Sequence, residues 1–524
     1  MPPIACVDRI RWSDAGQRCD TPGTAPGNRH RGTVSAIDRR QFLQRAIAAG
    51  AGAAVIPSTM VAAQPAAPGE GPYGPLATEP DENGLLLPEG FTSRIVAIGG
   101  ETVDGTDYTW HAFPDGAATF PTDDGGWIYA CNSEVTAAFA SDQGGVSAIR
   151  FDADGEVVDA YRILEGSTSN CAGGPTPWGT WMSCEEPLDK RGRLWECDPT
   201  GEKEAVAHEA MGLWNREAAA VDPEAEVVYM TEDDPAGLLY RYTPTAYPDL
   251  SAGAVHAAVV ADDGAVTWAE VPDPSAKSKP TKTQVEDATT FNGGEGIWYD
   301  RGSIYFTSKG DNKVHHIDLA SQQYEVIWDA DAVADGVEGA VLSGVDNISA
   351  DPATGDLFVA EDGGNMEVVL ISAEGVVAPF ARVAEDPTGS EITGPCLSPD
   401  RSRLYFSSQR GPSKKMLKEV IPGSTFDTRN AGITYEVTGP FRAAEAEPEA
   451  ATTTLAKANP SGSGSGSSGS SGSSDSKDES TSAPVVIGGI ALVAAAGVGA
   501  TIALRRRRSA EPAADVGDGD AADA

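Results

Sequence analysis

The feature that most constrains the fold is a repeat of about 50 residues through the middle of the chain. Each copy has a turn, then a short strand of aliphatic and aromatic residues, then a polar or acidic cluster. One aromatic residue marks each strand, and successive markers lie 52, 48, 76, 53 and 47 residues apart. This period with strand patterning is typical of β-propeller blades. The markers are Tyr129, Trp181, Tyr229, Tyr305, Phe358 and Tyr405.

We therefore predict an all-β fold, a six-bladed β-propeller. Residues 93–98 and 433–437 are also strand-like and lie at opposite ends of the repeats, so they could share one blade and close the ring. The gap of 76 residues indicates an insertion between Thr243 and Asp287. The alternative architecture is a β-sandwich or two β domains.

The N-terminal region has the features of a twin-arginine export signal. Arg39 and Arg40 precede a weakly apolar run, residues 46–63, which ends in small residues. This arrangement predicts that residues 1–63 form the signal region and residues 64–84 a linker. The alternative is a chance arginine pair before a buried helix. The twin-arginine pathway exports folded proteins, which would suit a metal centre assembled in the cytoplasm.

The C-terminal region has the features of a membrane anchor. Residues 443–483 form a Ser/Gly-rich linker, and residues 484–504 are 21 residues without a charge, about the length of a membrane-spanning helix. Four arginines open residues 505–524, a predicted cytoplasmic tail, because positive charge stays on the cytoplasmic side. The propeller, residues 85–442, is then expected at the cell surface. The alternative is a cleaved sorting tail or a buried helix.

The chain is strongly acidic, with a formal net charge of −40 at pH 7. This charge argues against nucleic acid as a partner, because phosphate binding needs an excess of Lys and Arg. It also repels a phosphate ester unless cations bound in the pocket neutralise the site. Surface acidity that serves solubility accounts for most of the 78 acidic residues.

A second pattern places potential metal ligands at similar positions in four repeats. Cys171, Glu217, Glu295 and Asp346 each lie ten to twelve residues before a marker. If each stands on the innermost strand of its blade, the four side chains meet at one rim of the central channel. Carboxylates gathered there would repel one another and take up protons unless cations were bound. The alternative is a set of solvated turn acids.

Other charged residues follow the marker strands. Lys309 and Arg410 occupy the position at which other repeats carry acids, which makes them candidate phosphate-binding residues. Arg216, beside Glu217, is a third candidate, and surface charges for solubility are the alternative for all three. The acids after the other markers could form a second layer of ligands: Glu134, Glu185 with Glu186, Glu232 with Asp233, and Glu361 with Asp362.

Five cysteines remain if the signal region is removed, and this odd number outside the cell implies at least one unpaired thiol or a ligand. Cys171 is the candidate for that role. Cys184 and Cys197 could form a disulfide, although the sequence does not fix the pairing.

The segment around Cys171 also carries a resemblance. Residues 170–186 combine this soft ligand with Glu185, Glu186, three glycines and two tryptophans, and they resemble the signature of the PhoX family of secreted alkaline phosphatases. The resemblance extends over roughly residues 88–441. Shorter motifs in the family's order are Pro114-Asp115-Gly116, Asn132-Ser133-Glu134, Arg216-Glu217-Ala218, Thr231-Glu232-Asp233, Glu295-Gly296, Glu361-Asp362-Gly363 and Thr393-Gly394-Pro395.

The resemblance implies a six-bladed propeller that holds iron(III) and calcium and hydrolyses phosphate monoesters. By it, Cys171 would bind iron, and Glu217 and Glu295 would bind iron or calcium. The chain departs from the family at Ser133 and Arg410, where members commonly carry His in Asn-His-Glu and Gln-His-Pro-Gly. Further candidate ligands by this resemblance are Glu134, Glu185, Glu232 and Glu361.

The expected mechanism is metal-assisted hydrolysis, in which metals clamp phosphate oxygens and supply an activated nucleophile. A Ser-His-Asp triad is disfavoured, because Ser133 has no credible base and His315 and His316 point to opposite faces of a strand. We expect a monomer that scavenges phosphate from small-molecule monoesters outside the cell. Two alternatives are a calcium-dependent propeller with lactonase-type activity and a non-catalytic binding propeller.

Overall fold

The computed structural model describes residues 66–140, 143–331, 341–384, 390–412, 415–424 and 429–443. The predicted export signal, the Ser/Gly-rich linker and the predicted membrane anchor and tail lie outside these residues, apart from the linker's first residue. Within the described ranges, no helix is both long and apolar enough to cross a membrane.

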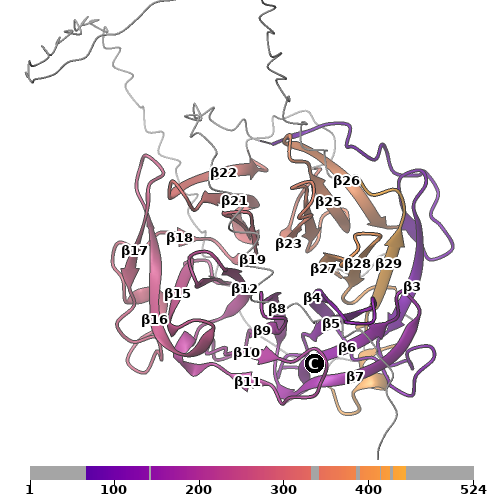
Figure 1. Ribbon diagram of the computed structural model, residues 1–524, viewed down its shortest axis with the longest axis horizontal. Helices are drawn as coiled ribbons and strands as arrows, with labels where there is room; N and C mark the ends of the chain where they lie inside the picture. Colours follow the sequence, from indigo (N-terminus) through magenta and orange to yellow (C-terminus); the bar gives the residue numbers. More distant parts are fainter. Residues whose placement is uncertain are drawn as a thin grey trace, which may run out of the picture. The chain divides into compact units, whose positions relative to one another are not determined.

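Six antiparallel blades surround a central axis, which confirms the predicted six-bladed propeller (Figure 1). We number the blades one to six in chain order. In each blade the first strand lies at the channel and later strands lie progressively outward. The innermost strands are β4 (Pro114–Pro121), β8 (Asn170–Pro175), β12 (Arg216–Asp222), β19 (Gly294–Asp300), β23 (Val345–Ala350) and β27 (Ile392–Leu397).

The six aromatic markers all lie on the second strand of a blade. These strands are almost wholly buried, because neighbouring blades cover both of their faces. The apolar run that the sequence shows at each marker follows from this position. The second strands are β5 (Trp127–Ser133), β9 (Trp181–Glu185), β13 (Val227–Glu232), β20 (Ser303–Ser308), β24 (Leu357–Glu361) and β28 (Arg403–Ser408).

The outer strands are more exposed, and the predicted insertion gives blade three a fifth strand, β17 (Val266–Glu270). A small two-stranded sheet of β14 (Gly237–Leu238) and β18 (Thr290–Phe291) accompanies it. Four short helices complete the described structure: η1 (Glu209–Met211), η2 (Thr281–Thr283), η3 (Lys309–Asp311) and α2 (Leu417–Val420). The remaining outer strands are β6 (Gly144–Phe151), β7 (Val157–Ser167), β10 (Leu194–Cys197), β11 (Val206–Ala207), β15 (Tyr240–Ala246), β16 (Asp249–Val260), β21 (Lys313–Asp318), β22 (Gln323–Asp329), β25 (Glu367–Ile371) and β26 (Val376–Val383).

Blade six contains both ends of the propeller, as the sequence predicted. Its outermost strand is β3 (Thr92–Ile98), which pairs antiparallel with β29 (Ile433–Thr438) from Ile433 opposite Ile98 to Thr438 opposite Thr92. The chain before β3 also packs on the ring, because β1 (Ala67–Pro68) and β2 (Leu85–Leu86) both pair with β26 of blade five. The packed structure therefore begins within the predicted linker.

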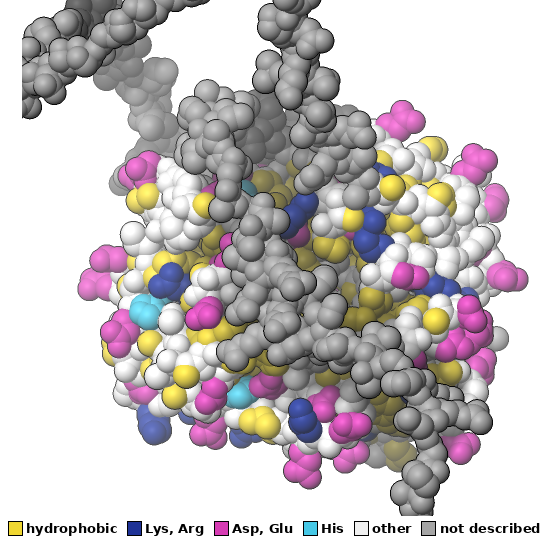
Figure 2. Space-filling view, viewed as in Figure 1, with side chains coloured by type: hydrophobic (Ala, Val, Ile, Leu, Met, Phe, Trp, Pro, Cys, Tyr) yellow, Lys and Arg dark blue, Asp and Glu magenta, His cyan; other side chains and the backbone are white. Residues whose placement is uncertain are grey.

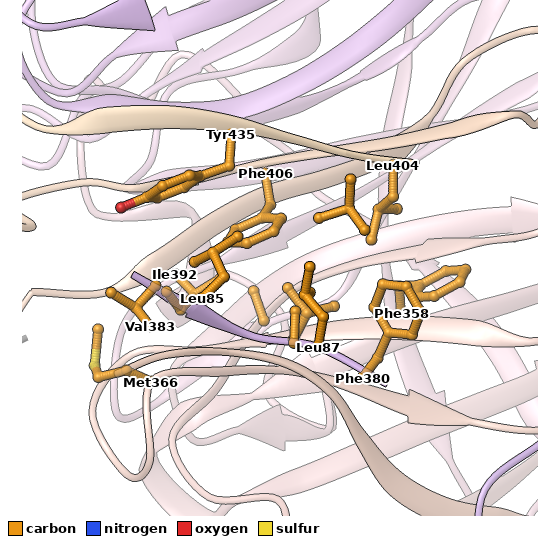
Figure 3. Packing of buried hydrophobic residues seen from close by; sticks show 14 of the residues in the cluster. Leu85, Leu87, Phe358, Met366, Phe380, Val383, Ile392, Leu404, Phe406 and Tyr435 are labelled. Carbon is orange, nitrogen blue, oxygen red and sulfur yellow. The ribbon is translucent and has the colours of Figure 1, made fainter. Parts of the chain in front are cut away.

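The apolar core lies between neighbouring blades. Between blades five and six, Leu85 and Leu87 sit among Phe358 and Phe380 of one blade and Phe406 of the next (Figure 3). Acidic side chains lie around the edge of the face seen in Figure 2, in keeping with the net negative charge.

The five cysteines of the described residues are all free thiols, so the possible disulfide between Cys184 and Cys197 is not formed. The two lie on adjacent strands, but Cys184 pairs with Leu194 and Cys197 pairs with Trp181. An offset of three residues turns their side chains to opposite faces of blade two, since side chains alternate along a strand. Each thiol accordingly packs in a different apolar cluster.

Replacing Phe406 by Ala should lower the free energy of unfolding by about 3–5 kcal/mol, because its ring is buried and lies 5.4 Å from the ring of Tyr435 on β29. Ile95→Ala on the closing strand β3 is the matched control, since Ile95 is 38% exposed and should cost less than about 1 kcal/mol. Denaturant unfolding of both variants checks this. Equal losses would contradict the buried interface between blades five and six.

Candidate metal centre

Each innermost strand has a β-bulge at the same level. In blade one, Pro114 pairs with Ser133 and Ala117 with Cys131, so two residues lie opposite one. The same two-against-one arrangement recurs in the other five blades. A bulge re-aims the side chain of the extra residue. The first bulge residues, in blade order, are Asp115, Cys171, Glu217, Glu295, Asp346 and Gly394.

Small residues beside the bulges allow the innermost strands to approach closely. A Cβ added to Gly116 would lie 2.5 Å from the Cα of Ala172, and one added to Gly296 would lie 2.6 Å from the backbone nitrogen of Ile348. Both contacts are with the next blade, so only glycine fits at these two positions. The narrow ring brings bulge residues from different blades together.

Hydrogen bonds between blades fix the backbone at three of the bulges. The Asn132 side-chain amide donates to the carbonyl oxygen of Cys171 at 3.0 Å. The hydroxyl groups of Thr231 and Thr307 donate in the same way to the carbonyl oxygens of Glu295 and Asp346 in the next blade. The residue opposite one bulge thus positions the ligand-bearing residue of its neighbour.

The bulge residues converge with acids from other loops into connected groups of potential ligands. In each group, one ligand atom per residue lies within 4.8 Å of the others. Glu217, Glu295 and Asp346 form one fully buried group. The other groups are Glu134 with Cys171 and Glu186; Asp115 with Glu134 and Glu391; and Asp346 with Asp362 and Glu391. We call these eight acids and Cys171 the acidic cage.

Glu217 is buried without a hydrogen-bond partner. Its side chain is fully buried, and neither carboxylate oxygen has a hydrogen bond from the described residues. Burial, followed by the charges of Glu186 and Glu295, raises the pKa of Glu217 well above its usual value. A buried carboxylate in this position is stable in its charged form only beside a cation.

Cys171 is the sulfur donor of the cage. Its Sγ lies 3.6 Å from Oδ2 of Asp115. Burial, and then the charges of Asp115 and Glu217, raise the pKa of the thiol well above its usual value. Metals bind the thiolate form of cysteine. A cation beside Cys171 would stabilise that form and so favour loss of the proton.

Two cations face the cage. The ammonium group of Lys309 lies 3.1 Å from carboxylate oxygens of Glu295, Asp346 and Asp362. The Arg410 guanidinium lies 3.3 Å from Glu134 and 3.1 Å from Glu391. Burial disfavours the charged form of Lys309, but the nearby carboxylates nevertheless raise its pKa well above its usual value. Eight acids against these two cations leave a surplus of negative charge that metal ions could neutralise.

Three predicted ligands, Glu185, Glu232 and Glu361, do not belong to these groups. Each is mostly buried, and its carboxylate accepts hydrogen bonds that hold a nearby loop or strand. The donors are the Arg193 N–H for Glu185, the Leu238 N–H and the Tyr240 hydroxyl for Glu232, and the N–H groups of Ser343, Asn365 and Glu367 for Glu361.

The residue that follows each of these acids lies at the cage instead. Glu186 and Asp362 are members of it. Asp233 is also near the cage. Burial raises its pKa above the usual value, and the positive charge of Lys309 lowers it in part. Consecutive residues point in opposite directions along an extended chain, so only one acid of each pair can face the channel.

Arg216 also points away from the cage. Its guanidinium is completely buried, donates to the carbonyl oxygens of Met211 and Gly212, and lies 3.6 Å from the Trp214 ring centroid. Alternation along β12 turns Glu217 to the channel and Arg216 into the blade. The structure therefore brings Lys309 and Arg410 to the cage, but not the third predicted cation.

Two residues of the cage, Asp115 and Glu391, were not among the ligands predicted from the sequence. Asp115 lies 14 residues before the Tyr129 marker, because β4 has eight residues whereas the other innermost strands have six or seven. Its place in the motif Pro114-Asp115-Gly116 was the available signal. Glu391 directly precedes β27, and no repeat pattern pointed to it.

The three residues considered for a serine triad, Ser133, His315 and His316, make their hydrogen bonds away from the cage. Ser133 is buried, and its hydroxyl donates to the Ala112 carbonyl oxygen at 2.7 Å. His315 contacts Ser308 and Tyr324, and His316 contacts Glu325 and Ser303, all within blade four.

The cage residues fit metal ions by their chemistry. Carboxylate oxygens are hard donors suited to calcium, and the thiol of Cys171 is the soft donor that favours a transition metal. The unpartnered oxygens of Glu217 supply independent support.

Comparisons with known proteins agree with this arrangement. Residues 143–329 and 321–411 match the family model for alkaline phosphatase PhoX, and together these matches span more than half of the chain. The structure is similar to Pseudomonas fluorescens PhoX in complex with vanadate, a transition state analogue, with a TM-score of 0.55 and 18% identity over 72% of this chain and 97% of that one.

Lower TM-scores of 0.36 relate the chain to a gluconolactonase from Xanthomonas campestris, at 11% identity over 72% of this chain and 98% of that one. The same TM-score relates it to regucalcin, a calcium-binding protein from Agrobacterium tumefaciens, at 16% identity over 67% of this chain and 97% of that one. No curated protein matches the chain.

Glu217→Gln should stabilise the metal-free protein at pH 7.5 by on the order of 1–3 kcal/mol, because the wild-type carboxyl is ionised when unfolded but resists ionisation when folded. A folded pKa raised above the unfolded value lowers stability as pH rises past about 4.5, so the two proteins should differ little at pH 4.

Added calcium should stabilise the wild type more than the Gln variant. Denaturant unfolding with chelator and with calcium measures both effects, and a variant that gains as much from calcium as the wild type would remove Glu217 from the ligands.

Proposed function

The chain belongs to the PhoX family of alkaline phosphatases, and we propose that it hydrolyses phosphate monoesters at metal ions bound in the acidic cage. One observation carries this proposal: four buried acids and the half-buried Cys171, from the bulges of five blades, meet beside the two cations Lys309 and Arg410. The Pseudomonas fluorescens PhoX structure contains vanadate, a transition state analogue, which supports the same chemistry here.

The donor groups suggest how the ions would be divided. Cys171 with Glu134 and Glu186 would hold iron(III), because this group contains the soft donor. Glu217, Glu295 and Asp346 offer only oxygen atoms and would hold calcium. Bound cations would supply positive charge that polarises the phosphoryl group and favours attack at phosphorus.

Lys309 and Arg410 would hold the substrate. Each is paired with two or more cage acids, so its charged group is already fixed at the edge of the cage. Once metal ions share those acids, the ammonium and guanidinium groups can donate to phosphoryl oxygens. Arg410 can do so through two N–H groups at once. Such preorganised donors stabilise the charge that develops during phosphoryl transfer.

The cellular role is part of the proposal. The twin-arginine signal and the C-terminal anchor predicted from the sequence would place the propeller outside the cytoplasm, tethered to the membrane. There it would release phosphate from organic monoesters for uptake. Iron(III) and calcium, loaded before export, would remain in the buried cage.

The purified protein, loaded with iron(III) and calcium, should release phosphate from p-nitrophenyl phosphate, and a calcium chelator should abolish this activity. Lys309→Met should lower kcat by about 10²–10³, as removal of a charge-stabilising donor does. Lys313→Met is the matched control, because Lys313 pairs with Asp311 and Asp329 outside the cage. Lactone turnover without phosphate release would contradict the proposal.

Cys171→Ser should remove any visible metal–thiolate absorption and lower kcat at least about tenfold, because a serine hydroxyl is a poor ligand for iron(III). Cys184→Ser is the control, since this thiol packs in the apolar cluster between blades two and three, outside the cage. Absorption spectra and metal analysis of the two variants provide the measurement. An unchanged spectrum in Cys171→Ser would exclude the thiol from the iron site.

A further inference from the structure

Two arginines lie against a pair of phenyl rings beside the acidic cage. The Arg410 Cζ lies 5.7 Å from the centroid of Phe113, and the Arg429 Cζ lies 5.8 Å from that of Phe139. The two rings pack edge to face, with centroids 5.7 Å apart. This contact brings Arg429 near Arg410, and the charge of Arg410 acts on it.

The backbone of Arg429 is held in place by helix α2. Its carbonyl oxygen accepts a 2.8 Å hydrogen bond from the Leu417 N–H. Leu417 is fully buried and packs with Phe113 and Val135, which belong to blade one and the loop after β5. The position of Arg429 is therefore set by the same apolar cluster that supports Arg410.

Arg429 differs from the other cations around the channel mouth. Lys309, Arg410, Lys190 and Lys282 each have a carboxylate oxygen within 3.3 Å. No carboxylate within the described ranges forms an ion pair or hydrogen bond with the Arg429 guanidinium, which is half-buried.

Arg429 nevertheless lies within the electric field of the cage. Burial and the charge of Arg410 lower its pKa, whereas Glu391, Glu134 and Asp362 raise it. Two guanidinium groups that repel each other, one of them without an ion pair to any acid that the structure describes, form a favourable place for an anion.

We propose that Arg429 is a specificity-determining residue that binds a second anionic group, such as a carboxylate, on the leaving-group side of a phosphate monoester. This inference rests on the proposed function. The cage and Arg410 would hold the phosphoryl group, so Arg429, which has no ion pair with a described acid, is available to the rest of the substrate. The preferred substrates are then phosphate monoesters of hydroxy acids.

The experiment compares two substrates that differ mainly in one charged group, 3-phosphoglycerate and glycerol 3-phosphate, using the full chain loaded with metal. In Arg429→Gln, the ratio of KM for 3-phosphoglycerate to KM for glycerol 3-phosphate should rise about fivefold, the loss expected for a half-exposed ion pair. The effect should fall on KM and not on kcat, because both ground and transition states keep the contact.

Two further variants serve as controls. Arg429→Lys retains the charge and should recover much of the preference. Arg191→Gln removes an exposed arginine that donates to the carbonyl oxygens of Ser275 and Ala276, and it should leave the ratio unchanged. An unchanged ratio in Arg429→Gln would overturn the inference, as would an equal loss for both substrates, which would place Arg429 on the phosphoryl group.

Binding separates this inference from the proposed function. If the loaded wild type hydrolyses no monoester, the proposed function fails. Calorimetric affinities of the same two compounds for the wild type and Arg429→Gln then decide the role of Arg429. A selective loss of 3-phosphoglycerate affinity supports it, and equal affinities for the two compounds in the wild type overturn it.

Discussion

The site depends on one backbone irregularity, a β-bulge repeated at the same level of every innermost strand. Five bulges carry an acid or a thiol. The sixth carries Gly394, whose φ of 58° and close approach to the Asp115 carbonyl oxygen leave no room for a side chain. Blade six contributes Glu391 and Arg410 to the site instead. A cation therefore lies at the blade whose bulge carries no acid.

Charge links this geometry to chemistry. Burial raises the pKa of Asp346 to about 6 and those of Glu134 and Glu391 to about 7, so the metal-free cage tends to hold protons. Bound metal ions could replace those protons. Lys309 and Arg410 are fixed cations that balance part of the charge and also face the place where a phosphoryl group would bind. The same acidity that repels phosphate at a distance thus orders the two cations that would attract it nearby.

Much of the fold could be predicted from the sequence, because the 50-residue spacing and the aromatic markers reflect the buried second strands. The register of Cys171, Glu217, Glu295 and Asp346 was also visible, since short turns keep the spacing to the marker nearly constant. Asp115 was not recognised, because its strand β4 is longer than the other innermost strands and so increases the spacing to the marker. Adjacent acids such as Glu361 and Asp362 were not distinguished, because their directions depend on where the strand ends, a detail of tertiary structure.

The strand β3 that closes the ring has a consequence for how the protein acquires its ions. The cage residues are spread from Asp115 to Glu391, so a partly synthesised chain holds only part of the cage, and an incomplete set of donors binds ions weakly. The complete cage therefore forms only once the first and last blades have joined, because Asp115 and Glu134 meet Glu391 across that junction. The compartment in which folding finishes, and the metals available in it, would then decide which ions the finished enzyme keeps.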